Sequence, residues 1–304
     1  MTLIALLTCL ALEMFWQRAD EYRRLDWLNQ YTDWMLGRLE KASWRDGAAG
    51  LVTVLLVPML VVGTAQSVLA GVWLGLLELI FGIVVLIYCL RFQSLDRLVD
   101  EYCDARDVED EARTQSVAAE LIGEASISDD DVVKAVLTQS NERLFSVLFW
   151  FVLLGPLGAL LCRLSYWLGY ESSGSMEDSQ GGQEPGFTDA ARRLSGILSW
   201  APARLLAVGY AVTGSFEDAV HAWRESTQRT DEGFTEANSQ ILYQTGLGAL
   251  RASSLLAEQP QKTERDEEER SGCAIIRAAH GLVLRAIVAW AIVVALVTLA
   301  GWVA

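Results

Sequence analysis

The chain has 304 residues and a net charge of -15, from 39 acidic and 24 basic residues, yet 52% of its residues are hydrophobic. A mean hydropathy of +0.26 is high for a soluble protein, so charged and apolar residues must occupy separate segments. The acidic excess argues against nucleic acid as a partner, because binding a phosphate backbone requires clustered Lys and Arg. Two histidines and five scattered cysteines do not suffice for a zinc site or a disulfide framework.

Residues 1–16 form an apolar run that Glu13 interrupts. The run lacks the basic start and the small-residue cleavage site of a signal peptide, so we interpret it as a retained membrane or interfacial helix. The next segment, residues 17–47, contains six basic residues, whereas residues 63–70 contain none. By the positive-inside rule, 17–47 is a cytoplasmic loop.

Residues 50–90 are predicted to form a transmembrane hairpin. Its spans are placed at 50–65 and 69–90, with the turn near Gly63. Glu78 lies inside the second span, where a lone charge costs at least ~2.5 kcal/mol. It therefore needs a counter-charge or marks a polar pocket.

Residues 91–143 are expected to be an acidic, helical, cytoplasmic loop. Within 94–119, the side chains of Leu95, Leu98, Tyr102 and Val108 recur at near-helical spacing. Ser128, followed by Asp131, is a capping box that opens a helix continuing into the next apolar segment. The acidic runs at 107–111, 129–131 and 266–269 suggest magnesium, but solvated helix faces explain them better, and no metal site is predicted.

Residues 144–168 are predicted to be a transmembrane helix. The uncharged stretch 144–162 would rise roughly 28 Å as a helix, close to the hydrocarbon thickness of a bilayer. The polar residues that follow, 169–193, are predicted to be a flexible linker.

Residues 194–214 hold Pro202 and Arg204 in the middle of an apolar segment. A continuous helix there would lose a backbone hydrogen bond and bury a guanidinium, which favours a broken or re-entrant membrane segment. Residues 215–281 are predicted to be a helical polar region, with an amphipathic helix from Phe216 and an acidic linker at 258–272. Their side of the membrane stays open, because it depends on whether 194–214 crosses. Residues 282–303 are predicted to form the C-terminal transmembrane helix.

The predicted fold class is therefore all-α: a polytopic helical membrane protein with helical cytoplasmic loops and a broken or re-entrant segment. No glycine-rich nucleotide loop appears, and no Ser or Cys nucleophile is paired with a histidine. The informative residues are the ionisable ones in apolar segments, namely Glu13, Glu78, Arg163 and Arg204. They either pair with one another across the helices or line a cytoplasm-facing pocket in which the arginines hold an anion.

Two segments carry a resemblance to a known family. The stretches FWFVLLGPLGALLCRL, at 149–164, and LSWAPARLLAVGYAVTGSFEDAVHAWR, at 198–224, resemble the AmpE proteins. The most specific element consists of Trp200, Pro202 and Arg204, and the acid at Glu13 fits the same pattern. The resemblance implies a polytopic inner-membrane protein of proteobacteria that regulates beta-lactamase induction and peptidoglycan recycling, alongside the amidase AmpD.

A more distant similarity connects the chain to the CobD/CbiB adenosylcobinamide-phosphate synthases. The paired acids of those synthases are replaced here, for example by Ser195 and Gly196. Carboxylates that would hold a metal and a nucleotide are therefore missing, which argues against amide ligation. The alternative function is a ligase of that type, forming amides with ATP and magnesium as cofactors.

The resulting site hypothesis combines these observations. The ligand would be a small anion such as a cell-wall fragment, bound where intramembrane acids provide the counter-charges of the arginines. The catalytic residues are unknown. The predicted ligand-binding residues are Asn141, Arg143, Arg163, Trp200 and Arg204, and the predicted intramembrane acids are Glu13 and Glu78. The predicted partners are the lipid bilayer and, through a functional link, an AmpD-type amidase.

Overall fold

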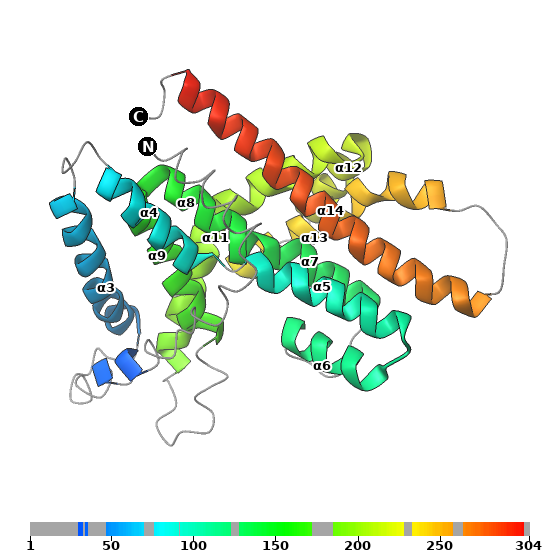
Figure 1. Ribbon diagram of the computed structural model, residues 1–304, viewed down its shortest axis with the longest axis horizontal. Helices are drawn as coiled ribbons and strands as arrows, with labels where there is room; N and C mark the ends of the chain where they lie inside the picture. The colour runs from blue at the N-terminus through cyan, green and yellow to red at the C-terminus, as the bar shows by residue number, and fades with distance from the viewer. Residues whose placement is uncertain are drawn as a thin grey trace.

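The computed structural model describes residues 30–32, 34–35, 47–69, 76–90, 92–122, 128–171, 185–227, 233–257 and 264–300. All regular structure in these ranges is helical, and no strand occurs in them (Figure 1). The predicted all-α fold class is confirmed. The expected N-terminal helix, with Glu13, lies outside the described residues.

The described elements follow one another as helices of very different length and polarity. In chain order they are α3 (Ala48–Leu69), α4 (Leu76–Cys89), α5 (Phe92–Asp107), α6 (Glu111–Ile122), α7 (Asp129–Ser140), η3 (Asn141–Phe145), α8 (Ser146–Leu154), α9 (Pro156–Tyr166), η4 (Trp167–Glu171), α11 (Pro185–Thr213), α12 (Phe216–Thr227), α13 (Phe234–Ala257) and α14 (Glu264–Leu299).

Two described helical segments are long and apolar enough to cross a bilayer: α3, Ala48–Leu69, and the Cys273–Leu299 part of α14. Leu77–Cys89 of α4 is apolar but shorter. Large apolar side chains on these helices are exposed, such as Leu60 at 57% and Leu296 at 62%. Surfaces of this kind suit lipid contact, and the fold is that of an all-α membrane protein. The predicted turn near Gly63 is not there, because α3 continues to Leu69.

The acidic loop contains two helices where one was predicted over 94–119. Glu109 has a positive φ of 58°, and the N–H of Asp110 donates to the carbonyl of Ala105, which ends α5. The chain then turns back and α6 packs against α5. Leu98 and Tyr102 are buried as expected, but Val108 lies in the turn and is 78% exposed, so its assignment to the buried stripe is wrong.

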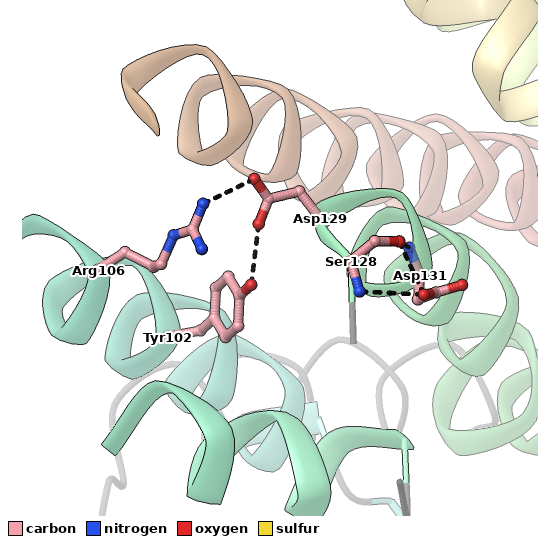
Figure 2. A network of polar contacts seen from close by, with 5 residues as sticks. All are labelled: Tyr102, Arg106, Ser128, Asp129 and Asp131. Atoms are coloured by element: carbon pink, nitrogen blue, oxygen red, sulfur yellow. Dashed lines mark hydrogen bonds and ion pairs between the residues drawn. The ribbon is translucent and has the colours of Figure 1, made fainter. Parts of the chain in front are cut away.

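Asp129 connects α5 to the start of α7 (Figure 2). The Tyr102 hydroxyl donates to Asp129 Oδ1 at 2.9 Å, and Arg106 Nη2 contacts Asp129 Oδ2 at 3.0 Å. Beside it, Ser128 and Asp131 cap one another, which confirms the predicted capping box. A carboxylate at a helix N-terminus is favourable, and here it also neutralises a cation from the neighbouring helix.

The segment 144–168 contains two short helices that fold back on each other, where the sequence predicts one spanning helix. Gly155 joins them with a φ of 67°, and Pro156 begins α9. Glycine accepts this left-handed geometry, while proline cannot continue α8 but is well suited to open a new helix. Glu142 and Tyr166 are 24 positions apart, roughly 36 Å along a straight helix, yet their side chains are hydrogen-bonded. Residues 146–166 are thus a helical hairpin.

The two arms of this hairpin touch closely near its tip. A Cβ on Gly158 would meet the Trp150 carbonyl oxygen and the Leu154 Cβ at well under van der Waals distance. The absence of a side chain at Gly158 therefore lets α9 lie against the backbone of α8. Leu153 and Leu154, beside the tip, are more than half exposed.

Helix α11 continues through Pro202, although the sequence predicts a break there. Pro202 has no N–H, so the carbonyl of Leu198, four residues earlier, lacks its helical donor. The indole N–H of Trp150 donates to that carbonyl at 2.9 Å and replaces the missing bond. Helix α3 uses the same solution, because the Tyr31 hydroxyl donates at 3.0 Å to Val54, four residues before Pro58.

Helix α14 begins at Glu264, inside the segment 258–272 that was predicted to be a flexible linker. Its opening residues are rich in Glu and Arg, which are good helix formers, and a structured helix can begin there once its apolar continuation packs. At 36 residues, α14 rises roughly 54 Å. His280 Nε2 lies 3.3 Å from Asp96 Oδ1, so the first half of α14 is held against α5. The second half of α14 continues as the apolar segment (Figure 1).

Replacing Trp150 by Phe should lower the free energy of unfolding by about 1–3 kcal/mol, because the Leu198 carbonyl loses its donor. Adding Pro202→Ala supplies a backbone N–H to the same carbonyl and should recover part of the loss. Denaturant unfolding in detergent measures both variants. Trp290→Phe is the control: Trp290 donates to the Leu205 carbonyl, but Gly209 keeps its own N–H there. If Trp150→Phe lowered the free energy of unfolding equally with and without Pro202→Ala, the Trp150 indole would not be the replacement donor for the Leu198 carbonyl.

Gly158→Ala should destabilise the hairpin by about 1–3 kcal/mol, the usual cost of overpacking, because its new methyl group collides with backbone. Gly281→Ala is the matched helical control, since a Cβ there meets nothing within 4 Å. Thermal unfolding should show a lower midpoint for Gly158→Ala and an unchanged or higher midpoint for Gly281→Ala.

Candidate functional site

Two π-helical turns lie at the open end of the hairpin, η3 before α8 and η4 after α9. Turns of this type often occur at functional sites, because they re-aim side chains within a helix. They carry or adjoin three of the predicted ligand-binding residues: Asn141 and Arg143 lie on η3, and Arg163 lies one turn before η4. The hairpin brings these residues to the same end of the structure.

The last turn of α7, directly before η3, is anchored to α11 through Tyr210. The backbone N–H of Asn141 bonds to the Thr138 carbonyl, and the Leu137 carbonyl accepts from the Tyr210 hydroxyl instead, at 2.9 Å, while Ser140 Oγ lies 3.0 Å from the same carbonyl. Ser140 Oγ lies 3.0 Å from the same hydroxyl. Tyr210 and Ser140 are almost fully buried. Shifting η3 would therefore leave polar groups unpaired inside the protein, which fixes its position.

Two stacked tyrosines lie between two arginines along the open end of the hairpin. The Arg163 guanidinium lies 5.8 Å from the Tyr166 ring, Tyr166 stacks on Tyr170 at 5.1 Å, and Arg192 of α11 lies 5.6 Å from the Tyr170 ring. Arg192 Nε also donates to the Gly169 carbonyl at 2.9 Å. We call Glu142, Arg143, Arg163, Tyr166, Tyr170 and Arg192 the hairpin-foot cluster.

Glu142 is the acid of this cluster. Burial raises the pKa of its carboxyl to about 7, although the hydrogen bond from Tyr166 and the charge of Arg143 both act in the opposite direction. Burial also raises the pKa of Tyr170. Glu142 is not among the predicted site residues, and neither are the two tyrosines or Arg192. Only the fold-back at Gly155 brings these four together, and no sequence pattern announces it.

The predicted anion holder Arg163 is 2% exposed and is the largest of the fully buried side chains. Asn141 is equally buried, and its Oδ1 accepts a hydrogen bond from Ser146 at 3.2 Å. Both residues lie inside the protein. Arg192 is the cluster's exposed cation.

Trp200 and Arg204 form a second group further along α11. Arg204 stacks on the Trp200 ring at 4.2 Å, and its Nη1 donates to the Trp200 carbonyl at 2.9 Å and to Asn238 Oδ1 at 3.0 Å. Arg204 lies 12 residues, roughly 18 Å, along the helix from Arg192. The first turns of α13 connect the two groups, because Tyr170 contacts Thr235 at 3.4 Å.

The predicted intramembrane acid Glu78 lies in the first turn of α4, near the end of the helix. An acid there is favourable to the helix dipole. None of the described residues forms an ion pair with it. Across the described ranges, no group of three or more His, Cys, Asp or Glu side chains could hold a metal ion.

The fold and the cluster define a class: an all-α membrane protein with a helical hairpin that gathers arginines, tyrosines and one titratable acid at its open end. The chain belongs to the AmpE family, described as regulatory signalling modulator protein AmpE, which matches residues 1–303.

Two curated relatives are cobalamin biosynthesis proteins CobD. The protein from Stutzerimonas stutzeri (strain A1501) is 28% identical over 235 residues, covering 75% of this chain and 71% of the relative. The protein from Chromobacterium violaceum is 30% identical over 125 residues, covering 40% and 36%. No solved structure matches the chain significantly. The sequence-based resemblance to AmpE, with CobD as a distant relative, is confirmed.

Glu142 should make stability depend on pH. Between its ordinary pKa of 4.5 and about 7, the folded protein keeps a proton that the unfolded chain has lost, so stability falls as pH rises through this window. Below the window both states are protonated, and above it both are ionised, so the slope vanishes. Glu142→Gln should flatten the dependence of the unfolding midpoint on pH between 4.5 and 7, whereas Glu217→Gln, on exposed α12, should leave it in place. A slope unchanged in Glu142→Gln would refute this assignment.

Proposed function

We propose that this protein is a regulatory component of the bacterial inner membrane that connects peptidoglycan recycling or beta-lactam stress to a cytoplasmic response, including beta-lactamase induction. The observation that carries the proposal is the match to a regulatory signalling family over residues 1–303. A functional link to an AmpD-type amidase follows from the same role, because such an amidase processes the cell-wall fragments that report the stress.

The proposed sensory site is the hairpin-foot cluster, and its ligand is a small anion such as a cell-wall fragment. Arginine binds carboxylates and phosphates through paired N–H donors, and Arg192 is exposed at the edge of the cluster. Glu142, with a pKa of about 7, is partly protonated at neutral pH. An anion bound at Arg192 favours the protonated form of Glu142, so ligand and proton would act together.

The response would travel along α7. Helical structure continues from Asp129 to Leu154 without interruption, so η3 at the cluster and the Asp129 contacts with α5 belong to one rigid element. Movement of η3 would be felt at the contact of Asp129 with Tyr102 and Arg106. We therefore propose that the cytoplasmic output surface consists of α5, α6 and the start of α7.

The hairpin bears on the proposed multi-pass topology. Because α8 and α9 fold back, the proposal assigns the residues before and after the hairpin to one side of the membrane, the cytoplasmic side to which it also assigns the loops 17–47 and 91–143. A reporter fusion after Asp231 tests the side of residues 215–281: they share the cytoplasmic side if α11 does not cross the bilayer, and they lie on the other side if it does.

Arg192→Gln should reduce beta-lactamase induction severalfold in cells challenged with a beta-lactam, with the protein present at normal level in the membrane. The reason is the loss of the exposed cation that stacks on Tyr170. Arg193→Gln removes a neighbouring exposed arginine of the same helix and is the matched control. An unchanged response in Arg192→Gln, or an equal loss in both variants, would count against the cluster as the sensor.

A second candidate function is suggested by the CobD relatives, which are cobalamin biosynthesis proteins by name. In this case the protein would be an amide-forming ligase that uses ATP and magnesium. Purified protein in detergent, given ATP, magnesium and a panel of amines and cell-wall fragments, should then form a product whose appearance depends on the nucleotide. If no product forms while Arg192→Gln still impairs induction, the regulatory proposal stands alone.

A further inference from the structure

An arginine stands in the middle of an exposed apolar stripe on α11. Ile197 is 53% exposed, Trp200 46% and Val208 42%, and Arg204 lies one turn from each of the last two. Residues at these spacings share one face of a helix. Whatever covers this face must offer an apolar surface and compensate a positive charge.

The Arg204 guanidinium is held in place before any ligand arrives. The Trp200 ring lies 4.2 Å from the guanidinium. Among the described residues, Arg204 makes two hydrogen bonds, and Nη1 is the donor of both. One acceptor is Asn238, which is 4% exposed and is itself fixed by donating to the Gly196 carbonyl at 2.9 Å. A guanidinium has five N–H donors, so Nε and Nη2 remain available for an acceptor outside these residues.

This group lies near the charged end of the uncharged part of α14. Just beyond Arg204, α11 contacts α14: Trp290 donates to the Leu205 carbonyl at 2.9 Å, and a Cβ on Gly209 would lie 3.1 Å from Ala286. The last charged residue of α14 is the exposed Arg285, and the sequence is uncharged from there to its end. Trp290 lies five residues further, roughly 7.5 Å along the helix, so the contact with α11 is close to the last charge of α14.

We propose that Arg204, Trp200 and Asn238 form a binding site for the phosphate headgroup of an anionic phospholipid, whose acyl chains cover Ile197. A phospholipid supplies an anion and an apolar surface in one molecule. The phosphate receives the remaining donors of a guanidinium that is already oriented, which limits the entropy lost on binding. The site is separate from the hairpin-foot cluster and does not depend on the proposed function.

The experiment measures thermal unfolding of the full chain in detergent as phosphatidylglycerol is added. The lipid should raise the unfolding midpoint, and Arg204→Gln should increase the concentration needed for half the effect about tenfold, the weight of one charge-assisted hydrogen bond. Arg204→Lys keeps the charge but loses the planar fork, so its effect should be intermediate. Arg285→Gln, which removes an exposed arginine of the neighbouring helix, should behave like the unchanged protein.

Three results would overturn the proposal. Inorganic phosphate or phosphatidylcholine could stabilise the protein as well as phosphatidylglycerol does, which would remove the need for an anionic lipid. Arg204→Gln could fold and respond to the lipid like the unchanged protein. Finally, lipid-free protein could form a dimer that Arg204→Gln dissociates, which would show that a second copy covers the stripe. If Arg204→Gln does not fold, Trp200→Leu must weaken the lipid response for the proposal to stand.

Discussion

The structure depends on one requirement: in apolar surroundings, every backbone carbonyl needs a donor. Three carbonyls lose theirs for identifiable reasons, Val54 to Pro58, Leu198 to Pro202 and Leu137 to the π-helical turn η3. Each accepts a hydrogen bond from an aromatic side chain far away in the sequence, namely Tyr31, Trp150 and Tyr210, and the Leu137 carbonyl also lies 3.0 Å from the hydroxyl of its neighbour Ser140. Since an unpaired buried carbonyl costs free energy, these bonds favour the packing of the helices that they connect.

The same bonds connect the hairpin to α11, and so they position the candidate site. Trp150 attaches α8 to the middle of α11, while Tyr210 attaches the last turn of α7 nearer the end of α11. With the hairpin fixed in this way, Tyr166 meets Glu142, and Tyr170 lies against Arg192. A cluster of charged residues at the end of an apolar hairpin is expensive unless each charge finds a counter-charge, a ring or a hydrogen bond. The tyrosine rings against Arg163 and Arg192 meet that condition for the two arginines.

The chain belongs to a regulatory signalling family, and the geometry of the cluster can be related to such a role. Under the proposed function, a ligand at Arg192 and a proton on Glu142 would act on the same cluster, and α7 would carry the effect to α5 and α6 without a hinge. The phospholipid site proposed on α11 would add a second input, because Arg204 lies on the helix that Trp150 and Tyr210 connect to the hairpin. The lipid composition of the membrane and the proposed anionic ligand would then both act on one helix, α11.

The sequence by itself determined the helical class, the apolar segments of α3 and α14, the capping box at Ser128 and the resemblance to AmpE. These follow from hydropathy, local hydrogen bonding and motif, all of which act over a few neighbouring residues. Only the tertiary structure decided that 144–168 folds back and that α11 stays whole at Pro202. It also decided that the five predicted ligand-binding residues divide into two groups. The reason is physical: a positive φ at Gly155 and a donated hydrogen from Trp150 matter only through partners distant in the chain, and local patterns carry no record of those partners.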